Sequence, residues 1–458
     1  MLLRKLDAQL FIALCLFLVV NIALANVGET SELLQQYVRL NTSNPPGNEI
    51  EGARFFADIF EKNGIPYEIV ESSPGRANIW ARLEGGDQPG VLLLHHMDVV
   101  PADPSRWRYP PFEATVAEGR VHGRGTLDNK STGIFHLQAF LALHRAGRPL
   151  TRDVIFMATA DEEAGGQQGV GWLMEHRPDL FEHIGAVLNE GSSGNLRNGQ
   201  LSFGVEITQK LPLWIKITAE GTPGHGAVPR QGSAPQRLVR ALSRLETLQF
   251  EARAIPVVAE YLQSIAKDAP PPWNRHLASA PQLAASSMLM SSLQTYDHRL
   301  HALLTTTCAL TRLAGSGKIN VVPPSASAEV DCRLLPDEEP ADVLAVLREN
   351  LAGDGITVEP ILSFGPGSSS TDNFLYRAIK QVLSVRYPHV PVLPKMNAGF
   401  TDSHFFREKE IAAYGFTPVI LTRSDGAGVH GDNENISLKN LKLGGEMTLE
   451  VLQEIVYD

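Results

Sequence analysis

The sequence has 458 residues, of which 43% are hydrophobic and 20% charged, and its formal net charge at pH 7 is −11. These values describe a globular chain long enough for two domains, because single cores stop growing at about 250–300 residues. The acidic balance argues against nucleic acid and anionic membranes as partners. The three cysteines, Cys15, Cys308 and Cys332, exclude a disulfide framework and a thiolate metal site, and leave open whether Cys308 and Cys332 pair.

The first 25 residues have the pattern of a signal peptide. Arg4 and Lys5 precede an apolar run at 10–20, and a small-x-small cleavage site follows at 23–25. The run is shorter than the roughly 20 residues that span a bilayer comfortably, which favours a cleaved signal peptide over an uncleaved membrane anchor. We therefore expect an exported protein, periplasmic or secreted, without stable membrane insertion after cleavage.

The chain from residue 26 to 210 alternates helical patterns with short, continuous apolar runs. Continuous apolar strands between helices are typical of an α/β domain whose sheet is covered on both faces. The expected helices lie at 30–40, 50–63, 128–146 and 169–177, and the expected strands at 66–70, 78–83, 91–94, 154–158 and 186–188.

The character of the sequence changes near residue 211, where a strand at 213–217 alternates in polarity. Patterns in the order strand-helix-strand-strand-helix-strand then predict a smaller α+β domain of ferredoxin-like type at 211–362, interrupted by a long variable region at 250–302. The α/β pattern of residues 26–210 returns at 363–458, which predicts that the small domain is inserted into the large one. The remaining expected elements are helices at 235–246, 340–351, 371–387 and 438–456 and strands at 303–310, 326–332, 357–362 and 419–421.

The strand at 91–94 runs into two histidines and an aspartate. Strand alternation puts His96 and Asp98 on one side and His95 on the other. A carboxylate two residues from an imidazole can hold one ring nitrogen and leave the other free for a metal. On its own, the pattern fits histidines satisfied at a strand end equally well.

Four further polar motifs follow strands or open helices. Asp128 stands where a glycine-rich loop enters a helix, which is most often the place of a helix cap. The acidic run 161–163 follows a buried strand and is tolerable there as an exposed turn or beside cations. With Glu190 at a strand end and His430 in a glycine-rich loop, these motifs gather at the edge where open α/β sheets bind ligands.

Imidazole and carboxylate groups without thiolates suit a catalytic transition-metal site better than a closed structural zinc site. Two zinc ions about 3.5 Å apart that share one carboxylate would polarise a carbonyl and activate a water. A further carboxylate must then stay off the metal to accept the proton of that water. Adjacent glutamates can supply both functions.

At these motifs the sequence resembles the dizinc hydrolase family of aminoacylase, acetylornithine deacetylase, succinyl-diaminopimelate desuccinylase and bacterial glutamate carboxypeptidase. The resemblance covers essentially the whole mature chain, with the motifs in family order. Residues 96–101 match His-x-Asp-Val-Val-Pro, which selects His96 over His95, and residues 123–128 match Gly-Arg-Gly-x-x-Asp. It implies a zinc-peptidase-like catalytic domain with a mixed sheet between helices at 26–210 and 363–458, and an inserted lid and dimerisation domain at 211–362.

The resemblance also implies two Zn²⁺ ions per chain, for which Co²⁺ or Mn²⁺ could substitute. Relatives use aspartate at the position of Glu190, so the motif is looser there. The implied ligands are His96 and Glu190 for one ion, Glu163 and His430 for the other, and Asp128 for both.

By the same resemblance, Glu162 is the general base and Asp98 orients His96. The family commonly has a cis peptide after the bridging aspartate, so the Asp128–Asn129 bond is expected to be cis, although that form is costly without proline. Asp161 receives no role.

Four residues of the inserted part and its flank match substrate-side motifs. His225 matches the lid histidine that stabilises the oxyanion, often in the neighbouring subunit of a homodimer. Asn320 matches a lid asparagine, Arg333 an arginine suited to a substrate carboxylate, and Gly399 a backbone contact to substrate. Without the resemblance, Asn320 would be read as a turn former and Arg333 as a surface residue.

The region 250–302 resembles the longer lid of vacuolar carboxypeptidase and of the secreted N-fatty-acyl-amino-acid hydrolase branch, which leaves open whether His225 acts in its own subunit. The implied function is an exported dizinc hydrolase of peptide bonds next to a free carboxylate, carboxypeptidase-like. N-acyl-amino-acid hydrolysis of the aminoacylase type is the alternative. A protein that kept the fold and binds ligands without catalysis is a rival interpretation. A nucleotide-binding function is disfavoured, because the sequence has no glycine-rich phosphate loop of the right spacing.

Overall fold

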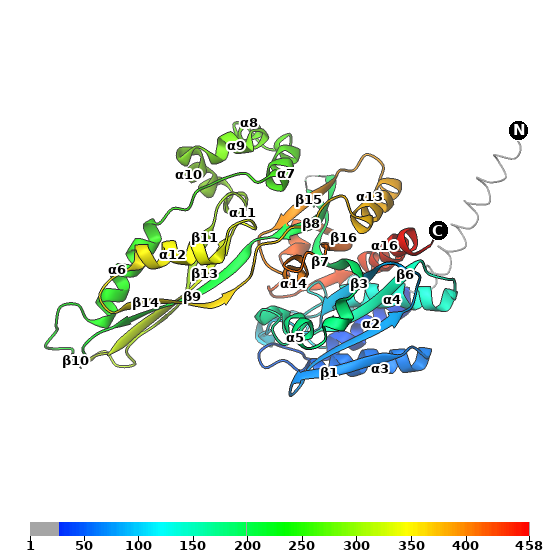
Figure 1. The fold of residues 1–458 in the computed structure, drawn as a ribbon, viewed down its shortest axis with the longest axis horizontal. Helices are drawn as coiled ribbons and strands as arrows, with labels where there is room; N and C mark the ends of the chain where they lie inside the picture. The colour runs from blue at the N-terminus through cyan, green and yellow to red at the C-terminus, as the bar shows by residue number, and fades with distance from the viewer. Residues whose placement is uncertain (1–26, 198, 458) are drawn as a thin grey trace, which may run out of the picture. The chain divides into compact units, whose positions relative to one another are not determined.

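The computed structural model describes residues 27–197 and 199–457, so the predicted signal peptide lies outside the described residues (Figure 1). The described residues form two compact units. The first unit holds the chain up to Glu206, the segment Ser369–Leu393 and the chain from Thr401 onward. The second unit holds Ile207–Ser368 and Pro394–Phe400.

The sheet of the first unit is mixed and has eight strands in the order β1-β2-β6-β3-β7-β16-β8-β15, of which β8 and β15 end in residues that belong to the second unit. The pairs β6–β3, β3–β7 and β7–β16 are parallel, whereas β2 is antiparallel to β1 and β6, and β8 is antiparallel to β16. The α/β class and the mixed sheet expected from the sequence are confirmed. The strands are β1 (Tyr67–Ser73), β2 (Arg76–Leu83), β3 (Gln88–His96), β6 (Arg152–Thr159), β7 (Ile184–Arg197), β8 (Gln200–Gln209), β15 (Val392–Asn397) and β16 (Ala413–Thr422).

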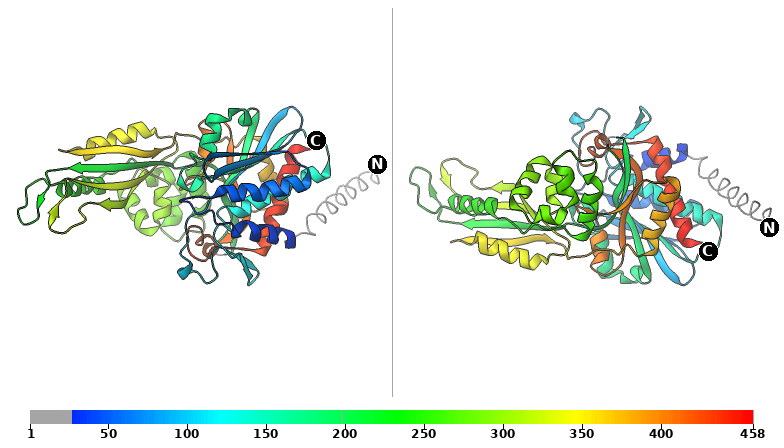
Figure 2. Two further views of the ribbon diagram at one scale, coloured as in Figure 1. Left: turned by 90° about the horizontal axis from the view of Figure 1, so that it is seen from below. Right: turned by 90° about the horizontal axis from the view of Figure 1, so that it is seen from above.

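Helices cover both faces of this sheet because its central strands are apolar on both sides. On one face, Phe156 of β6 packs against Phe56 of α3 and Phe140 of α4, and α2 lies beside α3 (Figure 2). On the other face, Met157 packs with Leu173 of α5 and Phe406 of α14. The helices of this unit are α2 (Val27–Arg39), α3 (Glu49–Asn63), α4 (Lys130–Ala146), α5 (Val170–His176), α13 (Phe374–Arg386), α14 (Ser403–Arg407), α15 (Arg423–Gly426) and α16 (Leu438–Val456).

A small three-stranded sheet also belongs to the first unit and holds together segments that are far apart in sequence. Its order is β17-β5-β4, with β17 antiparallel to β5. It thereby brings the C-terminal loop before β17 next to the glycine-rich loop after β5. The strands are β4 (Thr115–Ala117), β5 (Arg120–His122) and β17 (Asn435–Ser437).

The second unit contains a four-stranded antiparallel sheet in the order β11-β13-β9-β14. Strand β13 alternates between buried and half-buried residues, and its buried side packs with helices α6 and α12. A disulfide joins Cys308 of β11 to Cys332 of β13, which settles the pairing that the sequence left open. The elements are β9 (Leu211–Glu220), β11 (Thr307–Ala314), β13 (Ser325–Leu334), β14 (Ile356–Ser363), α6 (Ala234–Thr247), α12 (Pro340–Leu351) and the short pair β10 (Gly224–His225) and β12 (Val321–Val322).

The structure differs from the sequence-based expectations in three places. The variable region 250–302 is mostly helical and builds a core of its own, because its apolar residues face one another across short helices. The strand expected at 186–188 is the start of the longer β7, whose polar continuation pairs with β16 and β8. Residues 394–400, expected in the large domain, belong to the second unit. The helices of the variable region are α7 (Pro256–Ala266), α8 (Trp273–Ala278), α9 (Ala280–Ala284), α10 (Ser287–Tyr296) and α11 (His298–Ala302).

Within residues 27–197 and 199–457, none of the helices combines the length and the apolar character that a bilayer crossing requires.

Candidate metal centre

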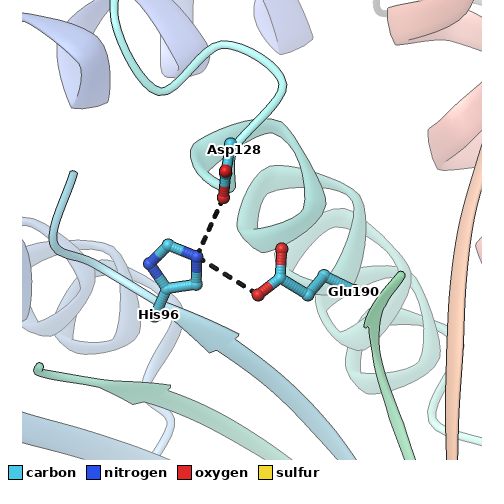
Figure 3. Close-up of side chains that lie close together, drawn as sticks. All are labelled: His96, Asp128 and Glu190. Atoms are coloured by element: carbon cyan, nitrogen blue, oxygen red, sulfur yellow. Dashed lines mark hydrogen bonds and ion pairs between the residues drawn. The ribbon is translucent and has the colours of Figure 1, made fainter. Parts of the chain in front are cut away.

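His96 ends strand β3 and is the centre of a first group of donors. Its Nε2 lies 3.1 Å from Oδ1 of Asp128 and 3.3 Å from Oε1 of Glu190 (Figure 3). Its Nδ1 donates to the carbonyl oxygen of Asp98 at 2.9 Å, and since a carbonyl can only accept, Nδ1 carries a proton. Nε2 is therefore the nitrogen available to a metal. His95 points to the other face, where its ring packs against Phe56, as strand alternation predicts.

A second group of donors shares Asp128 with the first. Nε2 of His430 lies 3.1 Å from Oδ2 of Asp128 and 3.1 Å from Oε2 of Glu163. The other carboxylate oxygen of Glu163, Oε1, is buried and has no hydrogen-bond partner among the described residues. The peptide between Asp128 and Asn129 is cis, as expected.

The pKa values of the two groups are shifted because several carboxylates lie close together in a buried place. Burial raises the pKa of both Glu163 and Glu190. Hydrogen bonds to Asp128 and Glu163 raise the pKa of His430 to about 10. Burial lowers the pKa of His96, but the carboxylates around it outweigh this effect and raise that pKa well above its ordinary value. Protons on the imidazoles thus balance the carboxylates when no other cation does.

These residues fit two divalent cations. Within each group the donor atoms all lie within 4.8 Å of one another. Two imidazoles and three carboxylates, without thiolate, form the donor set of a hydrolytic metal site. The Oε1 of Glu163 is buried without a hydrogen-bond partner among the described residues, and a bound cation would satisfy it. Two divalent ions would also overcome the charge of the three carboxylates. The five ligands predicted from sequence are His96, Asp128, Glu163, Glu190 and His430, and the structure brings all of them together.

The acidic run divides its three residues among different surroundings. Glu163 belongs to the second donor group, whereas Glu162 belongs to neither group. Glu162 is 6% exposed, and burial raises its pKa well above the ordinary value. Asp161, to which sequence analysis gave no role, has a left-handed backbone with φ 75°. Its Oδ1 accepts from Nη2 of Arg76 at 2.7 Å and its Oδ2 from the amide of Gln168 at 3.0 Å.

Asp98 contacts His96, as predicted from the sequence, and also binds three other residues. Its Oδ1 lies 3.4 Å from Nδ1 of His96. Its two carboxylate oxygens also accept the backbone amides of Glu162 and Glu163, each at 3.2 Å. Asn44 donates to Oδ2 of Asp98 at 2.8 Å. Asp98 therefore fixes the acidic run beside β3.

Two supporting residues were missed in the sequence. Arg76 on β2 pairs with Asp161 and also with the fully buried Glu49, and Asn44 comes from a loop before α3. Neither lies near a recognisable motif. A buried carboxylate such as Glu49 needs a cationic partner, but its burial is visible only in the fold.

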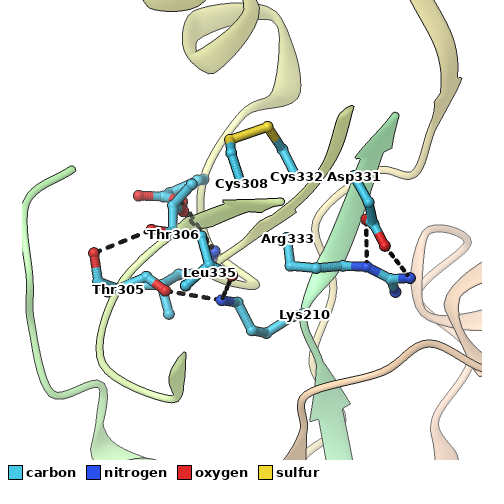
Figure 4. Close-up of a disulfide and its surroundings, with 10 residues drawn as sticks. Lys210, Thr305, Thr306, Cys308, Asp331, Cys332, Arg333 and Leu335 are labelled. Carbon is cyan, nitrogen blue, oxygen red and sulfur yellow. Dashed lines mark hydrogen bonds and ion pairs between the residues drawn. A yellow bond between two sulfur atoms is a disulfide. The ribbon is translucent and has the colours of Figure 1, made fainter. Parts of the chain in front are cut away.

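The four substrate-side residues predicted from sequence all lie in the second unit. His225 pairs with Val321, next to Asn320, in the β10–β12 ladder. The guanidinium of Arg333 binds Asp331 through Nε at 2.7 Å and Nη2 at 3.1 Å (Figure 4). It also lies 5.1 Å from the ring of Phe400, the neighbour of Gly399.

Comparisons with known proteins show the family and the fold of the chain. A family model described as peptidase family M20/M25/M40 matches residues 92–454. The N-fatty-acyl-amino acid synthase/hydrolase of Xenopus tropicalis is 27% identical over 409 residues, covering 87% of this chain and 78% of that protein. Human aminoacylase-1 is 27% identical over 404 residues, covering 85% and 87%. The fold is similar to that of an M20 family metallo-carboxypeptidase from Sulfolobus solfataricus, with a TM-score of 0.72, 21% identity and coverage of 93% and 99%.

Proposed function

The chain belongs to the peptidase family M20/M25/M40, and from this premise we propose that it hydrolyses an amide bond next to a free carboxylate. The observation that supports the proposal most is the pair of donor groups that share Asp128, with Glu162 beside them but in neither. This is the arrangement that two-metal hydrolysis needs, with one carboxylate left to move protons.

The acyl side of the substrate has two candidates. Carboxypeptidase-like cleavage would leave a peptide, and aminoacylase-type cleavage would leave a carboxylic acid. The second candidate is favoured by the relatives found by sequence, which are named for N-fatty-acyl-amino acid hydrolysis and as an aminoacylase. Both reactions release an amino acid whose carboxylate was free in the substrate.

When bound, two Zn²⁺ ions would polarise the amide carbonyl and acidify the attacking water, and Co²⁺ or Mn²⁺ could substitute. In the proposal, Glu162 accepts the proton that the water loses and passes it to the nitrogen that leaves. A buried carboxylate with a raised pKa suits both directions of this transfer. Asp98 keeps Glu162 in place through the amide that it accepts. Three carboxylates and two imidazoles would hold the ions: His96, Asp128, Glu163, Glu190 and His430.

Arg333 is proposed to bind the substrate carboxylate. Its Nε and Nη2 are occupied by Asp331, but its Nη1 is buried and has no hydrogen-bond partner among the described residues. One charged donor therefore remains for an anion, beside the ring of Phe400. His225 is proposed to stabilise the oxyanion, and Asn320 and Gly399 to contact substrate.

Export and a homodimer belong to the same proposal. The Cys308–Cys332 disulfide supports export, since disulfides persist in oxidising compartments. The edge strand β11 of the second unit exposes Leu310 and Leu313, which supports a dimer contact there. In such a dimer, His225 could act in its own subunit or in the partner.

Matched substrates test the proposed function. Purified protein loaded with zinc, cobalt or manganese is assayed on dipeptides and N-acyl amino acids, each paired with its C-terminal carboxamide. The free acids should be cleaved and the carboxamides should not. Arg333→Met should remove this preference while leaving the metal content unchanged. Equal cleavage of acid and carboxamide, or no hydrolysis of either class, would refute the proposal.

A further inference from the structure

Glu434 is a fully buried carboxylate that lies outside both donor groups. It stands four residues after His430, at the end of the loop that precedes β17. Its side chain accepts four hydrogen bonds, all from the glycine-rich loop that carries Asp128. The donors are Arg124 Nη1 at 2.8 Å and the backbone amides of Gly125 at 2.9 Å, Leu127 at 2.6 Å and Asp128 at 3.0 Å.

These bonds fix the backbone of the shared ligand itself. The amide of Asp128 donates to Oε1 of Glu434, and the amide of Leu127 donates to the same oxygen. The carbonyl oxygen of Glu434 accepts in turn from the amide of Gly123 at 3.0 Å. An ionised carboxylate that accepts several amides holds a loop more tightly than neutral acceptors would.

Arg124 extends the connection to the other ligand loop. Its Nη1 pairs with Glu434, and its Nη2 donates to the carbonyl oxygen of Gly431 at 2.8 Å, next to His430. The guanidinium is 3% exposed and lies 5.1 Å from the ring of Trp107. The buried charge of Glu434 is thus neutralised by a cation that binds both loops.

We propose that Glu434, with Arg124, is the positioning residue of the second metal site. The two loops that this ion pair joins carry Asp128 and His430, two of the three donors of that site. The first site depends less on the pair, since His96 and Glu190 lie on strands β3 and β7 of the main sheet. Glu434 therefore sets the affinity for the second ion without touching it.

Glu434→Gln tests the proposal with little change in shape. A carboxylate accepts at both oxygens, whereas the amide NH₂ of glutamine would face two donors. Ligand-orienting residues of this kind change metal affinity by about 10- to 100-fold. We expect the variant to bind the second Zn²⁺ ion about 10- to 100-fold more weakly and the first within a fewfold of wild type.

The measurement is titration of chelator-treated protein with Zn²⁺ against a competing chelator, with circular dichroism to confirm the fold of each apo-protein. Arg124→Met is the second variant, and it carries the same criterion if Glu434→Gln does not fold. Glu450→Gln is the matched control, because it breaks another ion pair of the first unit, with Arg386 at 2.7 Å, away from both loops. It should leave both affinities unchanged.

The outcome separates this inference from the proposed function on which it rests. If wild type binds fewer than two ions, the two-metal function fails first. If wild type binds two ions and a folded Glu434→Gln or Arg124→Met variant binds both as tightly, the positioning role is refuted. Equal weakening of both ions also refutes it, because that result would show a general loss of structure.

Discussion

Nε2 of His430 lies 3.1 Å from Oε2 of Glu163, while the preceding glutamate belongs to neither donor group. Two adjacent side chains with the same chemistry thus have different neighbours, because both lie in a short 3-10 helix at 162–164, where successive side chains point about 120° apart. That division leads directly to predictions about metal content.

Glu163→Gln and His430→Ala should each remove one of two bound ions and keep the other. Both residues belong only to the second donor group, whereas His96 and Glu190 belong only to the first. Elemental analysis of the purified variants should give close to one ion per chain. Variants that still hold two tightly bound ions would show that the second group is not a metal site.

Zinc binding should release a proton from His430 at neutral pH. Asp128 and Glu163 raise the pKa of His430 to about 10, so this imidazole is protonated before the metal arrives. An imidazole must lose its extra proton before it can bind a metal, so the apparent zinc affinity should fall as the pH falls. For the stability of the apo-protein the pH dependence is opposite: the raised pKa of His430 contributes its full stability below about pH 6.5, the ordinary pKa of histidine, and this contribution is lost as the pH rises through about 10.

Calorimetry of zinc binding in two buffers with different ionisation enthalpies measures this proton release. His430→Ala should release fewer protons than wild type at the same pH. Proton release identical in the two proteins would contradict the prediction.

Arg76→Ala should destabilise the fold, although the substitution removes none of the metal ligands. It would leave the carboxylates of Glu49 and Asp161 buried without their cation, a change that costs about 3–5 kcal/mol. Chemical denaturation of the apo-proteins measures the free energy of unfolding. Arg54→Ala is the control, because the exposed Arg54–Glu51 pair should contribute less than about 1 kcal/mol. Equal effects of the two variants would rule out the buried network as an anchor.

His136→Leu should make the protein less sensitive to acid. Burial lowers the pKa of His136 to about 3, and both ring nitrogens lack hydrogen-bond partners among the described residues. Below about pH 6.5 this histidine binds a proton in the unfolded chain but not in the folded chain, so the free energy of unfolding decreases as the pH is lowered. At about pH 5 this amounts to about 2 kcal/mol for one histidine.

The measurement is the free energy of unfolding of wild type and His136→Leu at neutral and acidic pH. The variant should lose less stability on acidification, by about the amount given above. Parallel losses in the two proteins would show that His136 does not contribute to acid sensitivity.

Much of this site could be predicted from sequence because His96 ends an apolar strand, Glu163 follows another, and the other ligands stand in motifs that match the family. Strand alternation separates His96 from His95, and the family pattern selects Glu163 over Glu162 as ligand. The supports of the site could not be predicted, since Arg76 reaches Asp161 across 85 residues and Glu434 reaches Asp128 across more than 300. Such long-range pairs follow from the topology of the sheets. The same limit explains why the region 250–302, whose short helices pack on one another, showed no pattern.

The measurement that tests the central claim most directly is the turnover and metal content of Glu162→Gln. The variant should keep two ions per chain and lose turnover of the best substrate by about 100- to 10,000-fold, the usual contribution of a general base. Glu163→Gln serves as the comparison, since it should lose an ion as well as activity. Near-normal turnover by a fully metal-loaded Glu162→Gln would contradict the account.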